Sequence, residues 1–388
     1  MRSKIKNILE GPVASNFLSS LTAIIIGLLF GFIILLVSNS GQALDGFKII
    51  LKGGFSGGLK GLGDTLYFAT PLIMTGLSVG FAFKTGLFNI GAPGQFVMGS
   101  FFAVYVGIMF PGMGSLQWAV ALLAGIIGGG LWGLIPGLLK AYKNVNEVIA
   151  SIMMNYIGMY MVNMLVKNSP RLFDTLRNQS KYPHPNAIIP KMGMNTLFPG
   201  SSVNGGIIIA LIAVIIIQIV LNKTTFGYEL KSVGHNRFAS KYAGINENRS
   251  IVLSMVISGA LAGLGGALLL LAGAGKHIEV LDILPVEGFN GIPVALLGMS
   301  HPVGVFFSAL FIAHLGRGGF YIQRLNFVPE VITMITASIV YFSAFALVVK
   351  SQIGKLTKKF TKNTDGANAN SDIPIIQNPK EHIPKEGQ

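Results

Sequence analysis

The sequence predicts an all-α integral membrane protein with about ten transmembrane helices. Hydrophobic residues make up 51% of the 388 residues and charged residues only 11%, whereas an ordinary soluble domain has about 25% charged residues. Uncharged runs of roughly 20 residues, the length that crosses a bilayer as a helix, recur along the chain. No stretch alternates apolar and polar residues as the strands of a membrane β-barrel do.

The uncharged runs set the predicted helices. Charged segments separate most of these runs, and Pro111-Gly112 divides the long run 85–139 into two helices. The ten helices are predicted at 17–37, 64–84, 96–110, 117–139, 146–166, 204–221, 250–275, 286–298, 302–316 and 331–349. Residues 1–350 therefore form the predicted transmembrane domain. The tail 351–388 is polar and rich in Lys, Asn and Pro, a composition that predicts a disordered segment.

The distribution of charge predicts the orientation of the helices. The net charge is +14, but the basic residues lie in the connecting segments and termini, which is the pattern of membrane topology and not of a nucleic-acid-binding face. With Arg2, Lys4 and Lys6 inside, ten helices place both termini in the cytosol and more than half of the Lys and Arg on the inner side. The exception is the external segment 167–205, which is basic, rich in proline, and either a docking site or an idle excursion.

An irregular stretch follows the second predicted helix. Residues 86–95 read GLFNIGAPGQ, and glycine and proline at this density predict a break in the helix that is buried or lines a cavity. The pattern recurs, because Phe88-Asn89 with Gly91 and Pro93 has a counterpart at 289–293. The two copies follow helices that run in opposite directions. They predict an inverted repeat of the second to fifth and seventh to tenth helices, with the transport pathway at the breaks.

Neutral polar and aromatic side chains near the breaks are the predicted contacts for a substrate. The pathway residues are Phe88, Asn89, Gln95, Asn155, Tyr156 and Asn290. Amides and aromatic faces suit a nucleoside, because a base stacks and a ribose forms hydrogen bonds. The alternative is that the amides only bond neighbouring helices. Tyr156, Tyr160 and Asn163 form a stripe that we expect to face the bundle interior.

The segment 222–249 is the longest charged interruption between two long apolar runs. Asn236 is suited to an N-cap and Gly244 to the position after a C-cap, which predicts a helix over 237–243. This helix is amphipathic, with Phe238 and Tyr242 on one side and Arg237 and Lys241 on another. Because so short a helix is unstable alone, it lies either on lipid headgroups or against a cytosolic partner. Gly234 and Gly244 would permit tight turns.

Three motifs resemble a known family. They are GLFNIGAPGQ at 86–95, NEVIASIMMNYI at 146–157 and GYELKSVGHNRFASKYAGI at 227–245. In this order, over about residues 17–349, the chain resembles permease subunits of bacterial ABC importers for simple sugars and nucleosides (the ribose and branched-chain amino acid type). The extended 167–205 segment is more similar to the nucleoside type. The chain departs from the family at Pro93, where an acidic residue is common, so no role of that carboxylate transfers.

The resemblance implies a fold like that of type II ABC importers, in the bacterial plasma membrane. It implies a coupling helix on Gly227–Ile245 that docks on an ATPase, with Gly234, Arg237, Phe238, Lys241, Tyr242 and Gly244 at the contact. The implied partners are two cytosolic ATPase subunits, a second identical or homologous permease subunit and an external substrate-binding protein. ATP would be bound by the partner, so no cofactor is expected in this chain.

Other classes of function are excluded or disfavoured by particular residues. Gly275-Lys276 and Gly354-Lys355 lack the surroundings of a phosphate-binding loop, and no nucleophile and base are paired, so we predict no enzyme. His301 and His314 have no carboxylate beside them, so no metal site is expected, and the absence of cysteine removes thiolate ligands. Glu147 and Glu287 begin helices and are interpreted as caps or helix-dipole partners.

The predicted function is therefore a nucleoside permease subunit of an ATP-driven importer. A ribose-like sugar permease is the alternative within the class. A self-sufficient secondary transporter is the alternative outside it, which the scarcity of ionisable residues in the helices disfavours.

Overall fold

The computed structural model describes residues 12–328 and 330–344, and the following concerns the compact unit Ser20–Ala344. The all-α prediction is confirmed, because strands occur in the described residues only as the short hairpin of β1 (Phe173–Asp174) and β2 (Gln179–Ser180). The predicted cytosolic tail 351–388 and the basic N-terminal residues Arg2, Lys4 and Lys6 lie outside the described residues.

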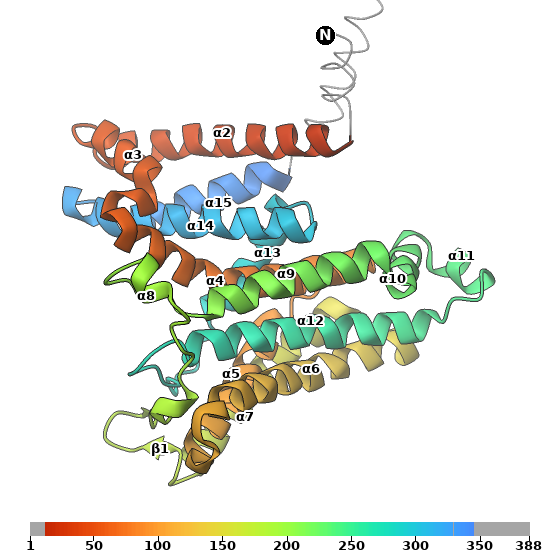
Figure 1. The fold of residues 1–388 in the computed structure, drawn as a ribbon. Coiled ribbons are helices and arrows are strands. Elements are labelled where there is room, and N and C mark those ends of the chain that lie inside the picture. Colours follow the sequence, from red (N-terminus) through yellow and green to blue (C-terminus); the bar gives the residue numbers. More distant parts are fainter. Residues whose placement is uncertain (1–11, 329, 345–388) are drawn as a thin grey trace, which may run out of the picture. The chain divides into compact units, whose positions relative to one another are not determined.

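The helices follow one another along the chain with short connections, apart from two longer segments at 168–205 and 271–285 (Figure 1). The α-helices are α2 (Pro12–Ser38), α3 (Ala43–Lys52), α4 (Gly58–Lys84), α5 (Ala92–Met109), α6 (Gln117–Lys143), α7 (Glu147–Lys167), α8 (Met194–Leu197), α9 (Gly206–Lys223), α10 (Thr225–His235), α11 (Arg237–Tyr242), α12 (Glu247–Leu270), α13 (Val286–Leu297), α14 (Pro302–Ile322) and α15 (Glu330–Ala344). Short 3-10 helices lie at Gly53–Gly57, Pro111–Leu116, Pro185–Ala187 and Gln323–Leu325.

Seven helical stretches in the described residues are long and apolar enough to cross a membrane, which makes this a multi-pass membrane protein. They are Ala43–Lys84, Ala92–Met109, Pro111–Lys143, Glu147–Lys167, Gly206–Lys223, Glu247–Leu270 and Pro302–Leu325. Three predicted helices appear as shorter apolar helices, at Ile24–Ser38, Val286–Leu297 and Glu330–Ile339. A helix of 12 residues such as α13 is about 18 Å long, which is less than the thickness of the hydrocarbon core.

Two boundaries differ from the predictions for identifiable reasons. The segment 38–63, which separates the first two predicted helices, contains α3 and the start of α4, because Ala43, Gly46 and Ile50 recur at helical spacing and are buried. The predicted helix 302–316 continues to Ile322 in α14. The charge of Arg317 ended the predicted helix, but a carboxylate neutralises it inside the protein.

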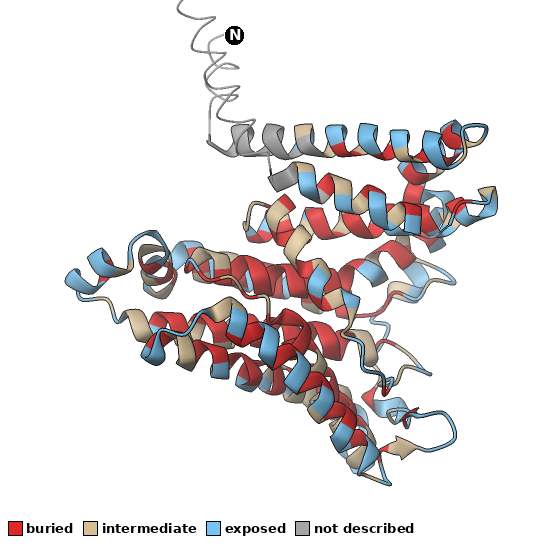
Figure 2. Cartoon of the chain, turned by 180° about the vertical axis from the view of Figure 1, so that it is seen from behind, coloured by how far each residue is buried: buried red, intermediate tan, exposed pale blue. Residues whose placement is uncertain are grey.

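The core is built on glycine contacts and on two deeply buried helices. A Cβ at Gly129 of α6 would collide with the carbonyl oxygen of Gly259, and one at Gly263 of α12 with that of Gly125. Small residues let two helix backbones approach closely, so α6 and α12 pack in direct backbone contact. Helices α4 and α12 are buried along most of their length, whereas α7 and α9 are less buried. Figure 2 shows how buried and exposed residues alternate along the helices that face this view.

The helix ends form two separate polar regions. The loop end comprises the segments 168–205 and 271–285 with the adjoining ends of α4 and α14, and the α10–α11 end comprises residues 224–246 with the nearby end of α4. The 18 residues of α9 run from one region to the other, which is a length of about 27 Å. Figure 1 shows β1 and α8 on the opposite side of the helices from α10 and α11.

Candidate functional site

The predicted break lies between α4 and α5. Helix α4 ends at Lys84 and α5 begins at Ala92, so residues 85–91 form the irregular connection. Pro93 lies in the first turn of α5, where its missing N–H leaves no hydrogen bond unmade. The counterpart at 289–293 is helical and lies within α13, so the prediction of a second unwound segment there is wrong. The first turn of α13 packs on the first turn of α5, because a Cβ on Gly288 would collide with Pro93.

Three predicted pathway amides hold the break in place. Asn89 Nδ2 donates to Gln95 Oε1 (2.8 Å) and Gln95 Nε2 donates back to Asn89 Oδ1 (3.1 Å). Asn155 of α7 accepts from the Gly94 N–H (2.8 Å) and donates to the Ile90 carbonyl (2.9 Å). All three are buried and line neither cavity described below. Their geometry matches the alternative in which the amides bond neighbouring helices and backbone.

The aromatic pathway residues Phe88 and Tyr156 take no part in this amide network. The ring of Phe88 stacks on Phe83 with 5.4 Å between the centroids. Tyr156 and Tyr160 are 51% and 53% exposed on the outer face of α7, so the prediction that this stripe faces the interior is wrong for both. It is right for Asn163, which is buried and donates to the Leu281 carbonyl. Large apolar residues lie on both faces of α7, so hydrophobicity alone could not distinguish the inner face.

A cavity of about 560 Å³, cavity 1, opens at the loop end between α4, α13, α14 and α15. Aromatic rings and polar side chains share its wall. Its polar and aromatic lining residues are Tyr67, Phe68, Lys276, Glu287, Asn290, Arg317, Phe320, Gln323, Thr333 and Thr336. Of the predicted pathway residues, Asn290 lines this cavity.

A second cavity of about 560 Å³, cavity 2, lies between α5, α7 and the segment 271–285. It shares Lys276 and Glu287 with cavity 1, so these side chains stand at the boundary between the two. Ser100 lines cavity 2, and its buried Oγ has no hydrogen-bond partner among the described residues. Asn163 contributes its amide from α7.

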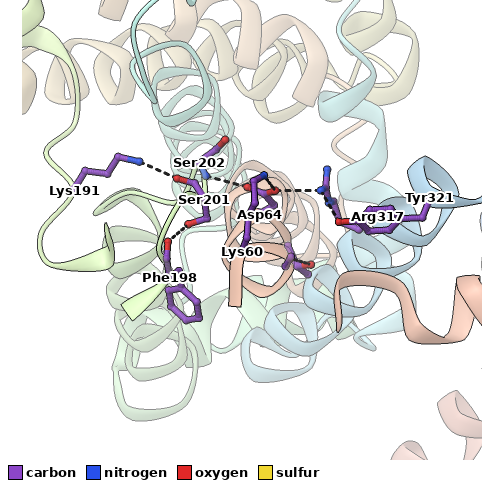
Figure 3. Close-up of polar contacts among 10 residues, drawn as sticks. Lys60, Asp64, Lys191, Phe198, Ser201, Ser202, Arg317 and Tyr321 are labelled. Atoms are coloured by element: carbon purple, nitrogen blue, oxygen red, sulfur yellow. Dashed lines mark hydrogen bonds and ion pairs between the residues drawn. The ribbon is translucent and has the colours of Figure 1, made fainter. Parts of the chain in front are cut away.

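A buried ion pair next to cavity 1 was missed by the sequence analysis. Asp64 Oδ2 lies 3.1 Å from Arg317 and 3.0 Å from Lys60, and its Oδ1 accepts from the Ser202 N–H (2.9 Å), as Figure 3 shows. The guanidinium of Arg317 also lies over the ring of Phe320 at 5.1 Å. This network joins α4, α14 and the end of the 168–205 segment. The sequence signal that could have indicated this pair was the position of Asp64 and Arg317, each at the edge of a long apolar run.

The 168–205 segment is an ordered clamp on the connection between α12 and α13. Ser180 N–H donates to the Ile278 carbonyl and Ile278 N–H donates to Ser180 Oγ, both at 2.9 Å. Farther along, Asn204 Nδ2 donates to the Ala272 carbonyl (2.8 Å). Residues 271–285 are called the strap. The strap therefore forms hydrogen bonds with two separate parts of the long segment, at Ser180 and at Asn204. The strap also supplies Lys276 to both cavities.

The α10–α11 end carries the predicted short helix. The Asn236 side chain accepts from the Ala239 N–H (3.0 Å), α11 runs from Arg237 to Tyr242, and Gly244 has φ +81°, so the predicted caps are confirmed. Helix α10 was missed. It begins after Thr224, whose Oγ1 accepts from the Gly227 N–H (3.1 Å), and a threonine cap of this kind was a readable signal.

The predicted coupling residues divide into exposed and internally bonded ones. Phe238 is 76% and Tyr242 95% exposed, and Lys241 is also exposed. Arg237 instead forms an ion pair with Glu247 (2.9 Å). Gly234 is a point of close approach, since a Cβ there would lie 2.5 Å from the Lys84 carbonyl oxygen. Helix α10 thus packs directly on the start of the 85–91 break.

The remaining titratable groups show no arrangement for metal binding. In the part of the chain that the structure describes, no cluster of three or more His, Asp or Glu could hold an ion. His301, before α14, has a pKa lowered from 6.5 by burial and by the charge of Lys84. Its Nε2 lies 3.5 Å from the Gln218 amide nitrogen.

Comparison with known proteins places the chain among transport proteins. It is 41% identical to the guanosine ABC transporter permease protein NupP of Bacillus subtilis (strain 168), over 89% of this chain and 98% of that one. It is 35% identical to the nucleoside ABC transporter permease protein NupB of Lactococcus lactis subsp. cremoris (strain MG1363), over 86% and 92%. The glucose ABC transporter permease protein TsgB13 of Haloferax volcanii is 31% identical over 72% and 74%.

No solved structure matches the chain. The family model described as the permease component of the branched-chain amino acid transport system matches residues 61–353. A match over this share of the chain shows that it belongs to this family of permease components.

Proposed function

We propose that the chain is the permease subunit of an ATP-driven importer of nucleosides. The chain is a permease component and not an enzyme. The nucleoside assignment is supported by the two relatives that match nearly their whole length and are named for guanosine and nucleosides. A simple-sugar substrate is the second candidate, favoured by the more distant glucose permease.

The observation that carries the importer class is the exposed aromatic pair on α11. Phe238 and Tyr242 lie four residues apart and are largely exposed. Their helix has six residues and cannot be stable without support. An exposed apolar patch with a charged rim marks an interaction surface. We assign Phe238, Lys241 and Tyr242 to the contact with an ATPase subunit.

Contacts within the chain connect the exposed surface of α11 with the break at residues 85–91. Arg237, held by Glu247, ties α11 to the first turn of α12, and Gly244 permits the turn between them. Gly234 sets α10 against Lys84 and Gly86 at the break. A displacement of the ATPase would move α10 against residues 85–91, and the Asn89, Gln95 and Asn155 network would pass that movement to α5 and α7.

This assignment sets the orientation. The α10–α11 end faces the cytosol together with the N- and C-termini, and the loop end faces outward. There the clamp of 168–205 on the strap offers a surface to an external binding protein. A second permease subunit, identical or homologous, would complete the pathway, and the partner ATPases would bind ATP. The packing of Gly288 on Pro93 is compatible with the inverted repeat, which would then rock as two halves.

The test is co-purification of the ATPase subunit from native membranes. The double variant Phe238→Ala, Tyr242→Ala should lose the ATPase, since it removes the exposed rings and leaves the caps of α11 intact. Leu176→Ala is the matched control, because Leu176 is 96% exposed at the loop end. It should retain the ATPase.

Two results would count against the proposal. If the double variant retains the ATPase as the control does, the docking surface lies elsewhere. If membrane vesicles without ATP exchange labelled nucleoside at full rate, the chain is a self-sufficient transporter. Faster uptake of hexose than of nucleoside in cells would favour the sugar permease.

A further inference from the structure

Cavity 1 has the size and lining of a small-molecule site. Its volume of about 560 Å³ falls in the range of about 300–1,000 Å³ typical of ligand pockets. Tyr67 and Phe68 lie side by side in sequence on α4, and Phe320 comes from α14 across the cavity. These rings are surfaces on which a planar base stacks.

The positive side chains of the cavity lie over its aromatic rings, and the buried Nε of Arg317 has no hydrogen-bond partner among the described residues. Arg317 binds Asp64 and lies over Phe68 and Phe320. Lys276 lies over the Tyr67 ring, with its Nζ 5.8 Å from the centroid. The aromatic rings of cavity 1 therefore each have a positively charged side chain beside them.

Glu287 is the acidic side chain of cavity 1, and it has no hydrogen-bond or ion-pair partner in the described part of the chain. It lies in the first turn of α13, where the helix dipole favours a negative charge. A carboxylate is acceptor-only and binds best to paired donors. Asn290 lies one helical turn later and lines the same cavity.

We infer that cavity 1 binds a nucleoside, with the base against Tyr67 and Phe68 and with Glu287 accepting hydrogen bonds from the substrate. The donors are the N–H groups on the edge of a guanine-like base or the hydroxyl groups of the ribose. Asn290 both donates and accepts, so it complements either group. Glu287 is then a specificity-determining residue beyond a helix cap, and this inference rests on the proposed import of nucleosides.

The test is photolabelling of the purified transporter with tritiated 8-azidoguanosine. Label should map to α4, the strap, α13 or α14, and excess guanosine should prevent it. Glu287→Gln should weaken the competition by guanosine about tenfold, since it replaces a charged acceptor. Glu279→Gln is the matched control, because Glu279 is an exposed strap residue that lines cavity 2 but not cavity 1. It should bind like the unmodified protein.

Competitors identify the group that Glu287 recognises. If adenosine competes weakly with the label in the unmodified protein but competes well in Glu287→Gln, Glu287 recognises the edge of the base. If 2′-deoxyguanosine competes weakly, Glu287 recognises the ribose. The inference is overturned if Glu287→Gln and Tyr67→Ala bind guanosine as tightly as Glu279→Gln, or if the label maps to residues 86–95. Co-purification of the ATPase is scored separately, so failure of this site and failure of the importer class give different results.

Discussion

The loop end and the α10–α11 end differ in how far their side chains are bonded within the chain. At the loop end Lys60 and Arg317 both bind Asp64, and the 168–205 segment bonds the strap through its backbone. At the other end, Phe238 and Tyr242 are left exposed. Buried ion pairs and backbone hydrogen bonds hold the first region together, whereas large apolar rings left in water mark a surface for a partner.

Breaking the loop-end network should have the largest effect on stability. Asp64→Asn keeps the shape of the side chain but leaves the buried Arg317 guanidinium without its counter-ion. Removing one partner of a buried ion pair costs about 3 kcal/mol or more. We expect a clear fall in the Tm of the detergent-purified protein.

Lys60→Gln is the control for that change. Lys60 bonds the same carboxylate, but its side chain is 59% exposed, so its loss should cost less than about 1 kcal/mol. Equal Tm values for Asp64→Asn and Lys60→Gln would show that the loop end is not held together by this pair.

The α6–α12 contact lies between the two ends and is the next largest test. Gly129→Ala would place a Cβ against the carbonyl oxygen of Gly259, a backbone atom that cannot turn aside. Overpacking of this kind costs about 1–3 kcal/mol. Gly130→Ala is the adjacent control, with its nearest atom at 3.5 Å, and it should be neutral or slightly stabilising. Thermal unfolding of both variants measures the difference, and equal destabilisation would contradict the close contact.

The smallest effect is expected at the α10–α11 end. Arg237→Gln removes the ion pair with Glu247. The side chain of Arg237 is 30% exposed and that of Glu247 is 16% exposed, so the loss of stability should be about 1 kcal/mol or less. Hydrogen exchange of residues 237–247 should become faster while the global Tm stays unchanged. A fall in Tm as large as that of Asp64→Asn would show that both ends depend on internal ion pairs and would remove the contrast between them.

Local signals in the sequence were sufficient for several features. The caps at Asn236 and Gly244 were predicted and observed, because a cap involves groups only two to four residues away. The break after Lys84 was predicted for the same reason, since glycine and proline act on their own backbone. The identity of the site could not be predicted in this way. Cavity 1 combines residues from α4, the strap, α13, α14 and α15.

By itself, the sequence determined the membrane class, most helix boundaries and the short capped helix α11, because hydrophobic runs and caps are properties of neighbouring residues. The tertiary structure alone decided which face of α7 is buried, that Asn89, Gln95 and Asn155 bond together, and that Asp64 meets Arg317 across 253 residues of chain. These outcomes depend on how helices pack. In a helix that is apolar on every side, no local pattern specifies the face that a neighbour will cover.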